Sequence, residues 1–260
     1  MAIEEITGKK GFICDMDGVI YHGNQLLTGA AEFVNWLQKE DKRFLFLTNS
    51  SERSPRELRQ KLERMGMDVE ESHFYTSALA TASFLSAQSP GCSAYVIGEP
   101  GLVNALYDVG ITMNDVNPDY VVVGDTRNYN FENIQRAVKF IFKGAKLIGS
   151  NPDYTNPLET GIAPATRSLV APIELTTGKS AYFVGKPNPL MMRTGLKLLG
   201  CKSEDTAIIG DRMDTDIIAG IESEIDTILV LSGVSDIHRP SEFPYRPKYI
   251  LNTVGDVLAP

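Results

Sequence analysis

Residues 12–18 read FICDMDG and are the most informative segment of the chain. Its first three residues form an apolar run typical of a buried strand, and an aspartate follows directly. The glycine that ends the stretch suits a tight turn. Two further apolar runs also end in polar residues, since 44–47 runs into Thr48 and 207–210 runs into Asp211. Because such runs alternate with helical patterns along the chain, the sequence predicts a parallel α/β fold.

A fourth apolar run, 182–185, ends at Lys186, and Asp216 follows shortly after Asp211. In open parallel sheets, ligands bind beyond the carboxyl ends of the strands. We therefore expect the four strands to lie side by side, so that the polar residues that follow them converge. These residues are Asp15, Asp17, Thr48, Lys186 and Asp211.

Carboxylates gathered in this way predict a bound cation. Two carboxylates about 4 Å apart repel each other by roughly 4 kcal/mol at an effective dielectric constant near 20. Oxygen ligands of this kind suit Mg²⁺, which often shares the phosphate of a substrate. The Lys186 ammonium and the Thr48 hydroxyl can hold phosphate oxygens. Asp15, at the tip of its strand, can attack phosphorus, and Asp17 can exchange protons with the leaving oxygen and with water.

Four motifs resemble those of the haloacid dehalogenase-like superfamily: DMDGV (15–19), LTN (47–49), GKP (185–187) and GDRMDTD (210–216). Their order, with the long gap between the second and third motifs, resembles the NagD-type phosphatases. This resemblance implies a Rossmann-like core with a doubly wound parallel sheet, made from residues 1–81 and 181–260. An α/β cap domain, residues 82–180, would be inserted in the core and would select the substrate.

The resemblance also implies a role for each motif residue. Asp15 would be the nucleophile and Asp17 the acid/base. Mg²⁺ would be held by the Asp15 carboxylate, the Asp17 backbone carbonyl and Asp211. Asp216 would support the metal site without binding the metal directly. The phosphate-binding residues that it implies are Thr48, Asn49 and Lys186.

Two other features stay open at the level of sequence. Asn151 and Asp153, in the cap loop 151–167, would either contact substrate or form a turn, and the two roles are equally well supported. His22 follows the DxDG turn and would either touch the site or lie in a surface loop.

The predicted substrate is a small phosphorylated metabolite, and the resemblance favours nucleoside monophosphates such as UMP over phosphoglycolate. A phosphotransferase or phosphomutase on the same scaffold remains an alternative, as does a non-catalytic protein that binds a phosphorylated ligand. Such a binder would need no nucleophile at Asp15. A dehalogenase is less well supported, because displacement of a halide needs neither a metal nor an acid at Asp17.

Composition excludes several other classes of protein. The net charge of the 260-residue chain is −8, which argues against a nucleic-acid partner, since that needs a basic face. The longest apolar runs are too short to span a bilayer, and the acidic start does not resemble a signal peptide. Three cysteines without CxxC spacing and three scattered histidines make disulfides and zinc poor expectations. We expect a cytoplasmic enzyme with no membrane partner, and the sequence leaves a homo-oligomer open.

Overall fold

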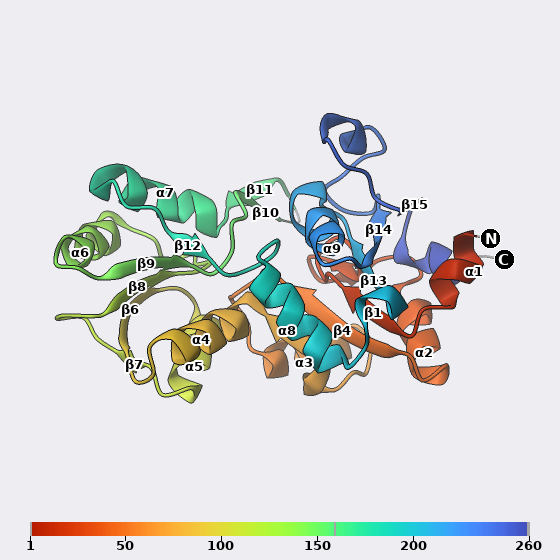
Figure 1. The fold of residues 1–260 in the computed structure, drawn as a ribbon, viewed down its shortest axis with the longest axis horizontal. Helices are drawn as coiled ribbons and strands as arrows, with labels where there is room; N and C mark the ends of the chain where they lie inside the picture. The colour runs from red at the N-terminus through yellow and green to blue at the C-terminus, as the bar shows by residue number, and fades with distance from the viewer. Residues whose placement is uncertain (1, 159, 259–260) are drawn as a thin grey trace. The chain divides into compact units, whose positions relative to one another are not determined.

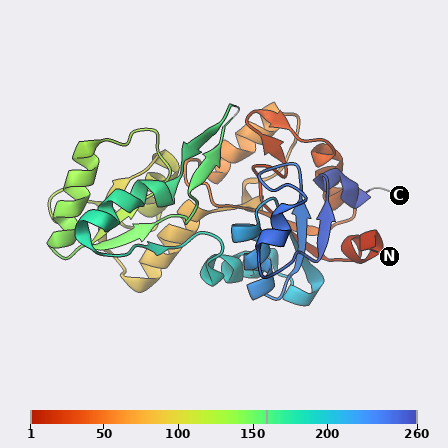
Figure 2. The ribbon, with the colours of Figure 1, turned by 90° about the horizontal axis from the view of Figure 1, so that it is seen from above.

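A computed structural model describes residues 2–158 and 160–258 and divides the chain into two compact units (Figure 1). The first unit contains residues 1–48, 58–75 and 186–260, and the second contains residues 49–57 and 76–185. Both chain ends belong to the first unit, where the N-terminal helix lies beside the C-terminal turn (Figure 2). No helix within the described ranges combines the length and the apolar character that a membrane crossing requires.

The first unit is built on a six-stranded sheet with the order β15-β14-β13-β1-β4-β5. From β15 to β4, neighbouring strands pair in parallel. Its strands are β1 (Gly11–Cys14), β4 (Arg43–Thr48), β5 (Phe74–Thr76), β13 (Thr206–Gly210), β14 (Asp226–Val230) and β15 (Tyr249–Leu251). A small hairpin, β2 (Tyr21–His22) and β3 (Gln25–Leu26), follows β1.

Helices and helical turns surround this sheet. The helices are α1 (Ala2–Thr7), α2 (Ala30–Lys39), α3 (Pro55–Arg64), α8 (Pro189–Leu199) and α9 (Ile218–Glu222). The short turns are η1 (Glu71–His73), η2 (Ser203–Asp205), η3 (Met213–Ile217), η4 (Arg239–Glu242) and η5 (Val254–Leu258). The first turn of α3 is closed by a capping box, in which the Glu57 amide donates to Ser54 Oγ at 3.3 Å and the Ser54 amide donates to Glu57 Oε2 at 2.8 Å.

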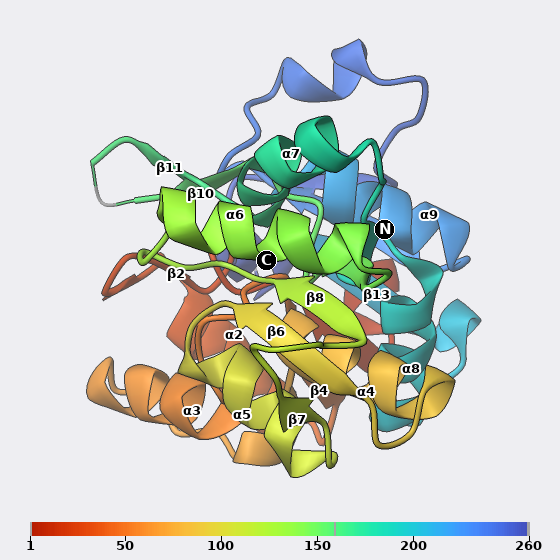
Figure 3. The same ribbon diagram turned by 90° about the vertical axis from the view of Figure 1, so that its left-hand side faces the viewer.

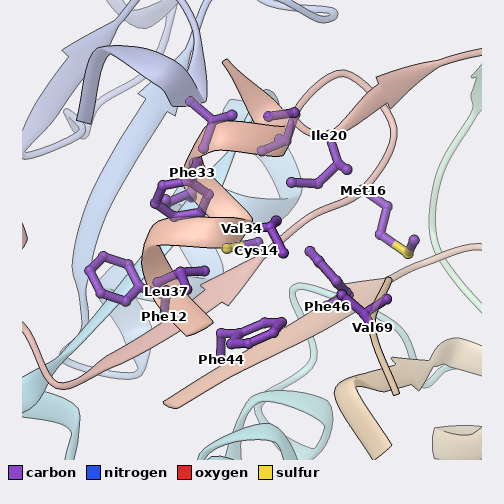
Figure 4. Close-up of a cluster of buried hydrophobic side chains, with 14 of the residues drawn as sticks. Phe12, Cys14, Met16, Ile20, Phe33, Val34, Leu37, Phe44, Phe46 and Val69 are labelled. Carbon is purple, nitrogen blue, oxygen red and sulfur yellow. The ribbon is translucent and has the colours of Figure 1, made fainter. Parts of the chain in front are cut away.

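Side chains alternate across the sheet of the first unit and bury both of its faces. Phe12 and Cys14 of β1 point into the cluster that contains Phe33 and Leu37 of α2 (Figure 4). Ile13, between them in sequence, faces α8, where a Cβ on Gly195 would lie 3.8 Å from its Cδ1. A sheet covered on both faces has the doubly wound architecture that the sequence predicts.

The second unit contains a five-stranded sheet with the order β12-β9-β8-β6-β7, and every pair in it is parallel. Its strands are β6 (Ser93–Ile97), β7 (Thr112–Met113), β8 (Tyr120–Val123), β9 (Lys146–Gly149) and β12 (Tyr182–Phe183). Its helices are α4 (Ser77–Gln88), α5 (Pro100–Asp108), α6 (Phe131–Phe142) and α7 (Thr166–Thr177), and β10 (Thr155–Pro157) pairs with β11 (Ile162–Pro164) as a hairpin. Helices α6 and α7 cover one face of the sheet, and α4 and α5 lie on the other (Figure 3).

One expectation about the strands is wrong. The strand before Lys186 does not lie beside β1, β4 and β13, because β12 pairs with β9 in the second sheet. The Phe183 ring lies against Gly149, where a Cβ would come within 2.3 Å of it. This close packing explains why β12 joins the second sheet. Lys186 itself belongs to the first unit, and the predicted limit at residue 81 falls inside α4.

Candidate active site

Three strand ends meet at one edge of the first sheet. Strand β1 lies between β13 and β4, and its register aligns Cys14 with Ile209. The next residue continues this pairing, since the Asp15 amide donates to the Ile209 carbonyl at 2.8 Å. Because the three strands are parallel neighbours, Asp15, Thr48 and Asp211 lie at the same edge.

The carboxylates of Asp15, Asp211 and Asp216 form a tight group at this edge. One oxygen from each lies within 4.8 Å of the others. Asp211 and Asp216 are buried, and Asp15 is half-buried. Carboxylate oxygens gathered so closely are the ligands that Mg²⁺ prefers in proteins, so the residues present fit the predicted metal.

Lys186 joins two of these carboxylates. The residue is only 1% exposed, and its ammonium donates to Asp15 Oδ1 and to Asp216 Oδ1, both at 2.7 Å. A third hydrogen bond goes to the Leu47 carbonyl at 2.8 Å. A buried ammonium is stable only with such partners, so Lys186 is fixed between β1, β4 and the turn after β13.

The group carries an excess of negative charge. Three carboxylates and one ammonium leave two negative charges, which one divalent cation would balance. Burial raises the pKa of Asp15 from 3.8 to about 7, against the opposing effect of Lys186. Burial, together with the charges of Asp15 and Asp216, also raises the pKa of Asp211. Burial alone would lower the pKa of Lys186, but the two facing carboxylates outweigh it and raise that pKa above 10.5. The lysine therefore stays charged, and the Asp15 and Asp211 carboxyls keep their protons to a higher pH than usual unless a cation is bound.

Asp211 is held by the loop that follows β14. The Val234 amide donates to Asp211 Oδ2 at 2.7 Å, and the Ser235 amide donates to the Asp211 carbonyl at 3.2 Å. Two glycines leave room for this carboxylate, since a Cβ would lie 2.4 Å from Asp211 Oδ2 on Gly18 and 2.0 Å from it on Gly233. Any larger residue at these positions would push the carboxylate away from its place in the group.

Asp216 is held by the turn that follows β13. This turn, η3, has the wide π-helical form that occurs often at functional sites. Asp216 Oδ2 accepts a hydrogen bond from the Arg212 amide at 3.1 Å, while Oδ1 faces Lys186. Gly210 gives the side chain room, because a Cβ there would lie 2.2 Å from the Asp216 Cβ.

Asp17 lies in the turn after Asp15, close enough for its charge to contribute to the raised pKa of Asp15. Gly18 has a φ of +79°, a left-handed conformation that favours glycine, and lets the chain turn here. The Tyr21 hydroxyl donates to Asp17 Oδ2 at 3.3 Å. His22 follows in hairpin β2–β3, where its side chain is exposed.

The predicted phosphate-binding residues divide between the two units. Thr48, buried at the end of β4, and Lys186 belong to the first unit, while Asn49 belongs to the second. Asn49 Nδ2 donates to Asp153 Oδ2 at 3.1 Å, and the Asn49 carbonyl accepts from Asn151 Nδ2 at 2.8 Å. Asn151 Oδ1 also accepts the Asp153 amide at 3.1 Å, as in a turn. The structure thus brings Asn49 together with both predicted cap residues.

Comparison with known proteins identifies the family. A model described as haloacid dehalogenase-like hydrolase matches residues 12–112, and one described as HAD-hydrolase-like matches residues 183–257. Ribonucleotide monophosphatase NagD of Escherichia coli (strain K12) is 42% identical over 95% of this chain and 98% of its own. Its solved structure covers the same shares with a TM-score of 0.89. This chain belongs to the haloacid dehalogenase-like hydrolases and is a NagD-type phosphatase.

Two further relatives of the phosphatase have other names. Dihydroxyacetone phosphatase of Corynebacterium glutamicum (strain R) is 44% identical over 97% of this chain and 92% of its own. Acid sugar phosphatase of Staphylococcus aureus (strain USA300) is 36% identical over 96% of this chain and 97% of its own. All three relatives are named as phosphatases, and their alignments cover nearly the full chain.

Sequence reasoning missed Asp125, which organises the second unit of the phosphatase. This carboxylate is 2% exposed and accepts six hydrogen bonds. Its Oδ2 accepts from the amide and the hydroxyl of Ser51, both at 3.3 Å, and from Asn151 Nδ2 at 3.1 Å. Its Oδ1 accepts from the amide and the hydroxyl of Thr166 at 3.1 and 2.9 Å, and from Asn156 Nδ2 at 3.4 Å. The sequence did contain a pattern that could have identified Asp125, because residues 121–125 (VVVGD) resemble residues 207–211 (AIIGD), which end in Asp211.

Proposed function

We propose that the phosphatase hydrolyses small phosphomonoesters with Mg²⁺, through a covalent phosphate on Asp15. The observation that carries the proposal is the buried group of three carboxylates and one lysine, with its two surplus negative charges. A protein that only bound a phosphate anion would gain nothing from this surplus, which repels the ligand. A metal-dependent enzyme with a carboxylate nucleophile requires it.

In the first step, an oxygen of Asp15 attacks phosphorus. The new bond between that oxygen and phosphorus forms as the bond to the leaving oxygen breaks. The proton of the Asp17 carboxyl moves to the leaving oxygen, so the product departs as a neutral alcohol. Lys186 supplies a fixed positive charge beside Asp15, and the Thr48 hydroxyl donates to a phosphate oxygen.

In the second step, water attacks the phosphorus of the phosphorylated Asp15. Asp17 takes the proton of that water, and the bond from phosphorus to the Asp15 oxygen breaks, which restores the carboxylate and releases inorganic phosphate. Mg²⁺, held by Asp15, Asp211 and the Asp17 carbonyl, would neutralise the phosphate charge in both steps.

The names of the relatives indicate which substrates to test first. The relatives at 44% and 42% identity carry different names, dihydroxyacetone phosphatase and ribonucleotide monophosphatase. We therefore propose nucleoside monophosphates such as UMP and short phosphorylated ketoses as the first compounds to test. Sugar phosphates come next, in view of the acid sugar phosphatase at 36% identity.

The test is phosphate release from a panel of phosphomonoesters, with Mg²⁺ and with excess chelator. The panel contains p-nitrophenyl phosphate, nucleoside monophosphates, dihydroxyacetone phosphate, sugar phosphates and phosphoglycolate. Asp15→Asn should abolish release from every compound, whereas Asp115→Asn, the same change on an exposed side chain, should leave release unchanged. Release that persists in Asp15→Asn, or that ignores the chelator, would contradict the proposal.

A further inference from the structure

We propose that Asn151 is a positioning residue, which holds Asn49 in the orientation in which it binds the phosphate of the substrate. The inference rests on the proposed function and on the phosphate contact predicted for Asn49. The sequence leaves two roles open for Asn151, a contact with substrate or a place in a turn. Because the residue is only 1% exposed, its side chain serves the interior of the second unit and not a substrate.

The side-chain amide of Asn151 is surrounded by partners. Its Oδ1 accepts the Asp153 amide at 3.1 Å. Its Nδ2 lies within hydrogen-bond distance of four acceptors, which are the Asn49 carbonyl at 2.8 Å, Asp125 Oδ2 and Thr166 Oγ1 at 3.1 Å, and Ser150 Oγ at 3.3 Å. Because the Asp125 carboxylate can only accept and the Asp153 amide can only donate, these two groups fix which way the Asn151 amide faces.

Asn151 holds both the main chain and the side chain of Asn49. Its Nδ2 donates directly to the Asn49 carbonyl, which also accepts from Ser77 Oγ at 2.5 Å. Its Oδ1 fixes the amide of Asp153, and the carboxylate of Asp153 accepts from Asn49 Nδ2 at 3.1 Å. All four residues are buried. Asn49 therefore cannot turn without breaking hydrogen bonds to buried partners, which is costly.

Asp125, just beyond the end of β8, anchors this arrangement. The oxygen that accepts from Asn151 also accepts from the amide and the hydroxyl of Ser51, both at 3.3 Å. Ser51 lies two residues after Asn49, so Asp125 fixes the chain beyond Asn49 while Asn151 fixes Asn49 itself. A buried carboxylate needs such donors, and this need keeps the Asn151 amide in place.

A positioning role and a contact with substrate have different consequences. The phosphate group is common to all phosphomonoesters, so a displaced Asn49 should slow hydrolysis of every substrate by a similar factor. Loss of a contact with the leaving group should slow only the substrates that make that contact. The carboxylates that would hold Mg²⁺ belong to the first unit, so metal binding should stay unchanged.

The experiment compares Asn151→Ser with the wild type. It measures kcat/KM for p-nitrophenyl phosphate and for the two alkyl phosphates that the wild type hydrolyses fastest, and the inhibition constant of inorganic phosphate. Serine is too short to reach the Asn49 carbonyl. Because a misplacement of about 1 Å can cost about 100-fold in rate, kcat/KM should fall by about 10- to 100-fold on every substrate, and the inhibition constant should rise about 10-fold.

Two controls accompany this variant. The Mg²⁺ dissociation constant of Asn151→Ser, measured by calorimetry without phosphate, should equal that of the wild type. Asn117→Ser, the same change on an exposed side chain of the second unit, should alter neither the rates nor the inhibition constant. Thermal melting shows whether Asn151→Ser is folded. If it is not, Ser77→Ala, which removes the other donor to the Asn49 carbonyl, decides by the same criteria with smaller changes.

A loss confined to one substrate, with an unchanged inhibition constant for phosphate, would assign Asn151 to a contact with substrate and overturn the inference. Unchanged rates on every substrate would also overturn it. So would Mg²⁺ binding that weakens together with phosphate binding, because that result indicates general damage to the fold. Failure of the proposed function would look different, because wild type would then release no phosphate or Asp15→Asn would still release it.

Discussion

The raised pKa of Asp15 predicts that, without Mg²⁺, the protein loses stability as the pH rises towards neutrality. The pKa of this carboxyl is about 7 in the folded protein and 3.8 in the unfolded chain. Between these values the folded state keeps a proton that the unfolded chain has released. The stabilisation is therefore fully present below pH 3.8 and is lost as the pH rises through about 7.

The size of the effect follows from the difference between the two pKa values. Each pKa unit corresponds to about 1.4 kcal/mol, so the full change is about 4 kcal/mol. The Asp15 side chain is only 12% exposed, so solvent screens little of it. For a chain of this length, about 1 kcal/mol shifts the melting temperature by about 2 to 4 °C. We expect the melting temperature of the metal-free protein to fall by about 8 to 16 °C between pH 4 and pH 7.5 on this account.

The assay compares melting temperatures of wild type and Asp15→Asn in chelator across this pH range. Asp15→Asn cannot ionise, so its melting temperature should fall less steeply and should exceed that of the wild type above pH 7. Mg²⁺ added at pH 7.5 should restore the wild type, because a ligand that binds only the folded state stabilises it. Parallel curves for the two proteins would contradict this prediction, since the burial of an ionised Asp15 would then cost nothing.

Three further predictions concern single side chains. Gly233→Ala should weaken Mg²⁺ binding in calorimetry at least about 10-fold, because the new Cβ would lie 2.0 Å from Asp211 Oδ2. The control Gly195→Ala should bind Mg²⁺ normally, because its Cβ would meet only flexible side chains at 3.3 Å or more. Equal affinities of the two variants would contradict this prediction. Lys186→Met removes the ammonium that faces the Asp15 and Asp216 carboxylates, so it should abolish turnover. In urea unfolding at pH 7.5 without metal, the variant should be less stable than the wild type by about 3 to 5 kcal/mol. A variant as stable as the wild type would show that Lys186 is not needed for charge balance. Asp125→Asn replaces one accepting oxygen by an NH₂ group, which would then face hydrogen-bond donors such as the amides of Ser51 and Thr166. The free energy of unfolding of the second unit should therefore fall by about 2 kcal/mol or more. An unchanged melting temperature would contradict this role.

The site in the first unit was predictable because strand ends mark it in the sequence. Apolar runs that end in Asp15, Thr48 and Asp211 identify three parallel strands, and hydrogen-bonded neighbours bring their ends together. The family resemblance added the order of the motifs. The position of Asp216 depends on the π-helical turn after β13, which no local pattern predicts.

Other parts depend on contacts between distant segments. The run 182–185 reads as a strand but does not reveal its partner, which the packing of Phe183 on Gly149 decides. Asn49 follows Thr48 directly, yet its side chain is bound to Asp153, a residue 104 positions away in the chain. The six donors around Asp125 come from separate segments, so only the folded chain shows why this carboxylate can be buried.

Trapping of the phosphorylated enzyme shows whether Asp15 is the nucleophile. Wild type is mixed with its best substrate and Mg²⁺, quenched in acid during turnover, and reduced with borohydride, which converts an aspartyl phosphate to homoserine. Peptide mass spectrometry then identifies the modified residue. We expect homoserine at position 15, and none in enzyme quenched without substrate. Rapid phosphate release with an unmodified Asp15, or homoserine at another aspartate, would contradict it.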